Sequence, residues 1–166
     1  DEEKQKVYMG RKTKKIGGGK FTGPGGKVDT NDKGQFLESL TDCAIREVWE
    51  EVEVLIMPRQ PEKVAIITFK NLGLEAALLV EVHFFLARKW IGEPQNSPEM
   101  IGGEWFSVSD LIERPHETAE MMAADYIFLP LILSGKKKIV GHCVYAPGGQ
   151  NEVVKWTYDE VESFPD

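Results

Sequence analysis

The segment from Lys12 to Asp29 constrains the fold of this chain more than any other. It contains Gly17, Gly18, Gly19, Gly23, Gly25 and Gly26, with Pro24 among them. Glycine and proline at this density predict a loop, because both residues disfavour the interior of helices and strands. Backbone without side chains can also approach a ligand closely. We therefore expect regular elements only on either side of this loop, and ligand contact or backbone mobility within it.

Hydrophobic periodicity predicts helices and strands before and after the loop. The first long helix carries Ile45, Val48, Trp49 and Val52 on one face, which we expect to lie in the core. The alternation of elements predicts one α/β domain over residues 1–166. The expected elements are a strand over 6–11, a surface excursion over 29–35, a helix over 37–54, paired strands over 64–69 and 77–87, a loop over 91–103, a strand over 104–108, a helix over 109–114 capped by Ser109, a helix over 118–134, and strands over 138–146 and 152–158 joined by a turn.

Composition excludes several classes of protein. A hydrophobic content of 42% is typical of a globular domain rather than a disordered chain. Only Cys43 and Cys143 are present, so we expect no disulfide, a reducing compartment and a cytoplasmic protein. The longest apolar stretch, Ile127 to Leu133, contains Pro130 and is too short for a membrane span. The net charge of −7 argues against binding to duplex nucleic acid, and we expect a monomer.

The densest chemical signal lies on the first long helix. At about 100° per residue, Glu47, Glu50 and Glu51 fall within one arc of the helix. Like charges at these spacings destabilise a helix by a few tenths of a kcal/mol each, so a cation should offset them. Mg²⁺ combines carboxylates with substrate phosphates and water. The alternative is a solvated acidic helix face.

The series Glu38-x7-Arg46-Glu47-Val48-x-Glu50-Glu51, preceded by a glycine-rich loop, resembles the Nudix box of hydrolases that act on nucleoside diphosphates linked to another group. The resemblance implies a Nudix-type α/β/α sandwich with a mixed β-sheet. It further implies that Glu47, Glu50 and Glu51 ligate Mg²⁺, or Mn²⁺ in its place. Arg46 would orient a metal-ligating glutamate, Glu38 would belong to the supporting ion pairs, and Gly26 could offer a backbone oxygen.

Two positions depart from the Nudix pattern. The glycine six residues before the first glutamate would fall on Asp32, so Gly25 and Gly26 correspond to it only if residues 29–35 contain an insertion of about six residues. The glycine after the paired glutamates is Glu53 here. Neither departure touches a proposed metal ligand, so they concern the shape of the loop and the end of the helix.

The resemblance continues outside the box. KVYMGRKTKKIGGGKFTGPGGKV, VEVHFFLA, SPEM, EWF and DYIFLPLILSGKKK look like segments of the animal-type MutT homologues, which hydrolyse oxidised purine nucleoside triphosphates such as 8-oxo-dGTP to the monophosphate and pyrophosphate. By this resemblance Glu99 matches an additional catalytic glutamate, and the first strand of the family is absent upstream of Asp1. A nucleotide is the expected substrate, and Glu51 or Glu99 is the expected proton acceptor.

The resemblance also indicates residues that contact the substrate. Lys12 and Lys27 lie near the glycine-rich loop, where they would meet phosphate oxygens. The family reads its purine with two adjacent aspartates and an asparagine. The aligned positions here are Ala124, Asp125 and Thr22, and Met122 aligns with a stacking tryptophan. With no carboxylate neighbour to share a proton, an ionised Asp125 would accept from the N1–H and N2–H₂ donors of a guanine-type base.

Three alternatives stay open at this point. The chain could hydrolyse another nucleoside diphosphate derivative, such as a nucleotide sugar or a dinucleoside polyphosphate. It could be a non-catalytic nucleotide-binding module, although no carboxylate of the box is lost. Asp125 could be a solvated helix residue, because aspartate is usually exposed. His83, in an apolar strand, is expected to be a satisfied core histidine rather than a ligand.

Overall fold

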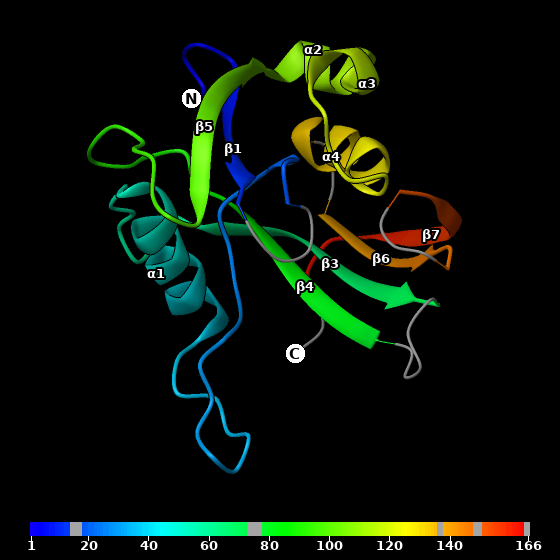
Figure 1. Ribbon diagram of the computed structural model, residues 1–166, viewed down its shortest axis with the longest axis horizontal. Helices are drawn as coiled ribbons and strands as arrows, with labels where there is room; N and C mark the ends of the chain where they lie inside the picture. The colour runs from blue at the N-terminus through cyan, green and yellow to red at the C-terminus, as the bar shows by residue number, and fades with distance from the viewer. Residues whose placement is uncertain (14–17, 73–77, 136–137, 148–150, 165–166) are drawn as a thin grey trace. The chain divides into compact units, whose positions relative to one another are not determined.

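The computed structural model describes residues 1–13, 18–72, 78–135, 138–147 and 151–164. Strands and helices alternate along this part of the chain, which confirms the expected α/β class (Figure 1). The elements are β1 (Lys6–Lys12), β2 (Phe21–Thr22), α1 (Leu40–Val52), β3 (Glu62–Asn71), β4 (Leu78–Leu86), β5 (Met100–Ser107), α2 (Val108–Glu113), α3 (Pro115–Thr118), α4 (Asp125–Leu133), β6 (Lys138–Tyr145) and β7 (Val153–Val161).

The chain divides into two compact units, of which the first comprises Asp1–Glu62 and Leu86–Phe106. Its sheet has the strand order β2-β1-β5. β2 is a two-residue strand within the predicted loop, where Phe21 pairs with Arg11 in antiparallel register. A side chain at Gly10 would collide with Met100, so the absence of a Cβ at Gly10 permits this close approach of β1 to Met100. The expectation that no regular element lies within the glycine-rich loop is therefore wrong for Phe21 and Thr22, because β1 supplies a pairing strand there.

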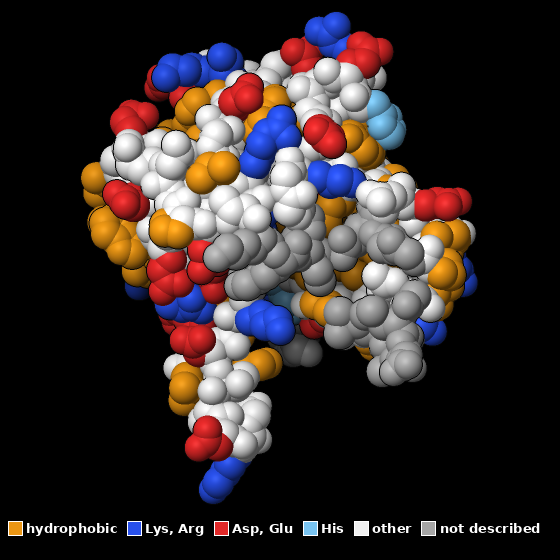
Figure 2. Space-filling model, in the orientation of Figure 1, with side chains coloured by type: hydrophobic (Ala, Val, Ile, Leu, Met, Phe, Trp, Pro, Cys, Tyr) orange, Lys and Arg blue, Asp and Glu red, His pale blue; other side chains and the backbone are white. Residues whose placement is uncertain are grey.

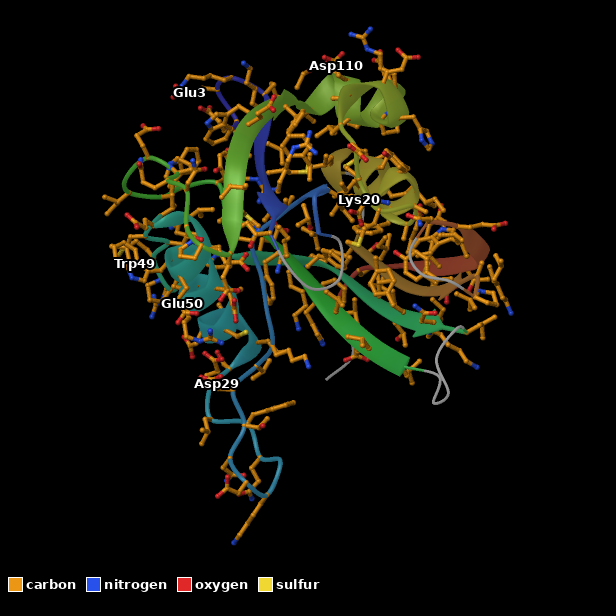
Figure 3. The ribbon with its side chains drawn as sticks, viewed as in Figure 1. Glu3, Lys20, Asp29, Trp49, Glu50 and Asp110 are labelled. Atoms are coloured by element: carbon orange, nitrogen blue, oxygen red, sulfur yellow. The ribbon has the colours of Figure 1, made fainter. Side chains whose placement is uncertain are left out.

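The core of the first unit forms where α1 packs beside this sheet. Val52, Val54, Ile56 and Met100 are buried together, and Ile45 and Val48 pack against them. The prediction that Trp49 belongs to this core is wrong, because its side chain is 54% exposed and Figure 3 shows it on the outer side of α1. Trp49 lies at the edge of the apolar stripe, about 100° around the helix from Val48.

Local capping sets the ends of α1 inside the predicted range of 37–54. The Ser39 hydroxyl accepts a hydrogen bond from the Asp42 amide at 3.0 Å, which makes Ser39 the N-cap. At the other end Glu53 adopts a left-handed conformation with φ 57° and donates its N–H to the Trp49 carbonyl. The capping residues Ser39 and Glu53 thus limit α1 to Leu40–Val52, which is shorter than the range of 37–54 that hydrophobic periodicity predicts.

The segment between the glycine-rich loop and α1 is an exposed hairpin, which we call the insertion hairpin (residues 29–37). Thr30 pairs with Phe36 across it, and the Leu37 amide donates to the Asp29 carbonyl at 2.8 Å. The Asn31 side chain accepts two backbone hydrogen bonds and so closes the turn. Figures 1 and 2 show the hairpin extending beyond the N-terminal end of α1. The expected surface excursion is confirmed.

The second unit comprises Lys63–Phe85 and Ser107–Asp166. Its sheet has the strand order β4-β3-β6-β7. β3 and β6 are parallel, with Ile67 opposite Gly141, whereas β6 and β7 are antiparallel, so the predicted mixed sheet is confirmed. Phe128 of α4 contacts Phe69 and Phe84 of the sheet, with ring centroids 6.3 and 4.7 Å apart. This aromatic contact holds α4 on the sheet.

The predicted long helix over 118–134 is wrong in its first part, because α4 begins only at Asp125. α3 ends at Thr118, and residues 119–124 between the two helices are not helical. Ala119 is extended, with φ −149° and ψ 144°. The Tyr126 hydroxyl donates to the Ala119 carbonyl and accepts from the Met121 amide, at 3.2 and 2.8 Å. A side chain that satisfies backbone groups in this way replaces the helical hydrogen bonds that periodicity predicts.

Two other boundaries differ from the prediction. β5 begins at Met100, inside the expected loop over 91–103, and Met100 is buried. α2 is capped by Ser107, whose hydroxyl accepts from the Asp110 amide, and not by Ser109. The expected turns at 70–75 and 147–151 fall largely outside the described residues.

Two sequence expectations concern isolated side chains. His83 is half-buried, and its Nε2 lies 2.9 Å from Glu81 Oε1. Its buried Nδ1 has no hydrogen-bond partner among the residues that the structure describes, so the prediction of a satisfied core histidine is wrong for this atom. Cys43 and Cys143 are both buried and free. None of the helices in the described ranges has the length and apolar character that crossing a membrane requires.

Candidate active site

Arg46 is the centre of an ionic cluster on α1. Its guanidinium donates through Nε and Nη2 to both oxygens of Glu38, at 3.1 and 2.6 Å. Its Nη1 donates to Glu47 Oε1 at 2.8 Å and to Glu50 Oε2 at 3.0 Å. The cluster offsets part of the repulsion between Glu47 and Glu50, because one arginine donates to both carboxylates. Figure 2 shows red and blue side chains side by side over this helix.

The Glu38 carboxylate is the most strongly perturbed acid of the cluster. The hydrogen bonds from Arg46, followed by that from the Asp29 amide, lower the pKa of Glu38 from 4.5 to about 2. In turn, the hydrogen bond with Glu38 raises the pKa of Arg46 above its ordinary value. The Asp29 amide lies at the base of the insertion hairpin (Figure 3), so Glu38 joins this hairpin to α1.

Glu47 and Glu50 converge on one point, because both carboxylates lie within 3.0 Å of the same guanidinium nitrogen of Arg46. Glu50 is 53% exposed at its side chain, and Figure 3 shows it on the outer side of α1. Gly26 lies against Glu47 of this pair, since a Cβ built there would collide with all three carboxylate atoms of Glu47. The glycine-rich loop thus contacts the acidic arc. The insertion hairpin, which lies between the loop and α1 in the sequence, protrudes and leaves this contact in place, as expected if residues 29–35 contain an insertion.

Glu51 differs from its two neighbours because it is buried, with 2% of its surface exposed. Its Oε1 pairs with Lys12 Nζ at 3.1 Å, and its Oε2 accepts from the Gly25 amide at 2.9 Å. Lys12 Nζ also donates to the Gly25 carbonyl at 2.5 Å. The three residues therefore connect β1, the glycine-rich loop and α1. Sequence reasoning missed this triangle, because nothing in the spacing of Lys12 and Glu51 indicates that they meet.

Glu99 is exposed, immediately before β5. Its carbonyl accepts from the Thr13 amide at 3.0 Å, which places its backbone next to the end of β1 that carries Lys12. Across the described residues, no three acidic, histidine or cysteine side chains converge closely enough to hold a metal ion. The structure thus brings Glu47 and Glu50 together and engages Glu51 with cationic and amide donors instead.

The donor set of the first unit fits a hard divalent cation. Two carboxylates already converge on one positive group, and Gly26 lies beside one of them, Glu47. Carboxylate and carbonyl oxygens are the ligands that Mg²⁺ takes in proteins. Glu47 and Glu50 would supply the charge, with Gly26 as a neutral ligand.

Besides Lys12, the expected substrate-contacting residues of the first unit are Thr22 and Lys27. Thr22 is half-buried on β2, opposite Gly10. Lys27 is exposed, and its carbonyl accepts from Arg46 at 3.2 Å. Lys27 is therefore connected to the ionic cluster through its backbone.

The expected substrate-contacting residues of the second unit are Met122 and Asp125, with Ala124 between them. Met122 is half-buried, whereas Asp125 is only 5% exposed as the first residue of α4. The reading of Asp125 as a solvated helix residue is therefore wrong. Ala124 is fully buried beside it.

Two residues near Asp125 were missed by sequence reasoning. Burial, followed by the negative charge of Asp125, raises the pKa of the Cys143 thiol to about 11. The same causes, in the same order, raise the pKa of Tyr145 above its ordinary value. Both residues lie on the buried face of β6, with Ile139 and Gly141. The period-two alternation of this strand is the signal that places them on one face.

The family described as NUDIX domain matches residues 1–128. An oxidized purine nucleoside triphosphate hydrolase of Danio rerio is 32% identical over 157 residues, which cover 95% of this chain and 88% of the relative. The protein of the same name from Mus musculus is 32% identical over 160 residues, covering 96% and 90% of the two chains.

Solved structures share the fold. A Mutator MutT protein from Bacillus halodurans superposes with a TM-score of 0.73 at 22% identity, over 93% of this chain and 90% of that one. A MutT NUDIX hydrolase from Burkholderia pseudomallei gives 0.57 at 21% identity, over 75% and 86%. The family model matches most of this chain, and the two relatives align with nearly all of it. This chain therefore belongs to the NUDIX domain family.

Proposed function

We propose that this protein is a Mg²⁺-dependent nucleoside triphosphate pyrophosphohydrolase that acts on oxidised purine nucleotides such as 8-oxo-dGTP. The observation that carries the proposal is the convergence of Glu47 and Glu50 beside Gly26. The names of the two relatives at 32% identity support the substrate class. Mn²⁺ would replace Mg²⁺ as a cofactor, because it also binds oxygen ligands.

Each site residue has a role in this proposal. Glu47, Glu50 and Glu51 hold the metal with the Gly26 carbonyl, and Arg46 positions Glu47 and Glu50 through its Nη1. The bound cation would neutralise phosphate charge and lower the pKa of water. Glu51 or Glu99 accepts the proton of the attacking water. Lys12 and Lys27 carry the positive charge that meets the phosphate oxygens.

Base recognition is assigned to Asp125 and Met122 of the second unit. Asp125 is buried, so its carboxylate is kept from bulk water and discriminates strongly between hydrogen-bond donors and acceptors. As an acceptor it pairs with the N1–H and N2–H₂ groups of a guanine-type base and repels the N1 acceptor of adenine. Met122 packs against the base. For Thr22 of the first unit, the resemblance alone supports a substrate contact, with a hydroxyl in place of the longer amide.

Product analysis tests the reaction. The purified protein is incubated with Mg²⁺ and a panel of normal and oxidised purine nucleoside triphosphates, nucleotide sugars and dinucleoside polyphosphates. We expect pyrophosphate and the nucleoside monophosphate from the oxidised triphosphates. Orthophosphate as the first product would refute the bond assignment, and preferred turnover of a nucleotide sugar would refute the substrate class.

Asp125→Ala tests the base contact. We expect guanine-type triphosphates to exceed adenine-type ones in kcat/KM for the unmutated protein, and the variant to lose this preference while keeping its dependence on Mg²⁺. Equal kcat/KM for dGTP and dATP in the unmutated protein would show that Asp125 does not read the base.

We also propose that the protein acts as a cytoplasmic monomer that does not bind duplex nucleic acid. The two buried free thiols suit a reducing compartment, and the net charge of −7 repels a polyanion. Sedimentation at micromolar concentration tests whether the protein is a monomer. A duplex-binding titration at low salt tests whether it binds duplex nucleic acid.

A further inference from the structure

The buried Glu51 carboxylate has both oxygens engaged. Lys12 Nζ lies 3.1 Å from Oε1, and the Gly25 amide donates to Oε2 at 2.9 Å. The side chains of Lys12 and Glu51 are 21% and 3% exposed. A carboxylate this buried requires a counter-charge, because an unpaired charge in the interior is strongly unfavourable. Lys12 supplies that charge.

The two partners of Glu51 differ in how readily they can leave. The Gly25 amide belongs to the backbone, so it moves only if the loop moves. Lys12 ends a flexible four-carbon stem, and its ammonium group can rotate to another acceptor without a change in the backbone. A divalent cation that approaches Glu51 would therefore replace the lysine and not the amide.

We propose that Lys12 is a positioning residue that serves as an exchangeable counter-ion for Glu51. Without a divalent cation it holds the Gly25 carbonyl and Glu51 together, and so keeps the glycine-rich loop on α1. When the cation binds, Lys12 leaves Glu51, and its ammonium becomes free to meet a phosphate oxygen beside the same loop. The inference depends on the proposed function only for the presence of a divalent cation at the acidic arc.

The exchange predicts opposite effects of one substitution on two measurements. Lys12→Met removes the counter-ion, so the metal-free protein should lose on the order of 5 °C or more in Tm. The same substitution removes a competitor of the cation, so Mn²⁺ should bind roughly tenfold more tightly. If Lys12 only stabilised the loop, Lys12→Met would lower both the Tm and the affinity for Mn²⁺.

The experiment uses the full chain without nucleotide. Thermal unfolding is followed in EDTA, and Mn²⁺ affinity is measured by titration calorimetry. Lys6→Met, at the other end of β1, is the matched control for loss of one positive charge and should change Mn²⁺ affinity less than twofold. Lys12→Arg keeps the charge and should restore most of the Tm and the lower affinity. If Lys12→Met is unfolded in EDTA, it should refold as Mn²⁺ is added.

Mn²⁺ binding to Lys12→Met that is equal to or weaker than binding to the unmutated protein would overturn the proposal. So would a variant that does not refold with Mn²⁺ while Lys12→Arg is fully stable. Because no turnover is measured, failure of the proposed function is seen separately. A protein that binds Mn²⁺ but hydrolyses no nucleotide would refute the hydrolase assignment and leave the test of Lys12 intact.

Discussion

Substitution of Glu38 by glutamine tests how much the ionic cluster stabilises the protein. Arg46 donates to both Glu38 oxygens and the Asp29 amide donates at 3.0 Å, which together lower the pKa of Glu38 from 4.5 to about 2. At about 1.4 kcal/mol for each pH unit between these values, the interactions contribute roughly 3 kcal/mol to the free energy of unfolding. The side chain is 14% exposed, so solvent screening reduces this only modestly, to roughly 2–3 kcal/mol.

The sign of the pH dependence follows from the direction of the shift. Because the folded protein has the lower pKa, the stabilisation is fully present above about pH 5 and disappears as the pH falls toward 2. Glu38→Gln, which cannot ionise, should therefore be less stable than the unmutated protein by roughly 2–3 kcal/mol at pH 7. The difference between the two proteins should shrink steadily below pH 4.

Urea unfolding followed by circular dichroism at pH 7, 5, 4 and 3 measures this difference. Glu3→Gln, an exposed residue outside the cluster (Figure 3), is the control and should change the free energy of unfolding by less than about 0.5 kcal/mol at every pH. A Glu38→Gln difference that is the same at pH 7 and pH 3 would refute the reasoning, because it would mean that the charge of Glu38 does not provide the stability.

Three further predictions follow from the geometry of the site. Gly26→Ala should lower kcat at least about tenfold, because the added Cβ would occupy the space of the Glu47 carboxylate. Gly23→Ala is the control and should keep normal turnover, since no atom lies within 4 Å of its added Cβ, and equal kcat for the two variants would contradict the prediction. Glu50→Gln should lower kcat by orders of magnitude with a Tm within about 3 °C of the unmutated protein, and near-normal turnover would remove Glu50 from the site. Glu53→Gly should raise the Tm by about 2–4 °C, since it relieves a left-handed φ of 57°, and a lower Tm in thermal unfolding would show that the conformation is not strained.

Local sequence patterns determined most of the elements and the acidic arc. The α1 residues Glu47 and Glu50 share a face because the helical repeat requires it, whatever the rest of the chain does. The strands β3, β4 and β6 follow from alternation and β-branched content, and the exposed insertion hairpin follows from its turn residues.

Tertiary contacts decided the features that periodicity could not reach. The predicted second helix starts only at Asp125, because the Tyr126 hydroxyl binds backbone groups of residues 119 and 121 in the non-helical segment before it. Trp49 matched the apolar stripe but lies at its edge, because the contacts of α1 cover only part of that stripe. Such outcomes depend on which atoms meet in space, and a helical wheel carries no information about them.

In the candidate site, too, some features follow from the sequence and others only from the tertiary structure. The sequence supplied the carboxylates and the glycines, yet only the tertiary structure separated Glu51, buried against Lys12 and Gly25, from the exposed Glu50 beside it on α1. It likewise showed Asp125 to be buried near Cys143 and Tyr145. The physical reason is that burial and charge pairing arise between residues far apart in the chain. Local propensity fixes only the direction in which each side chain leaves its own element.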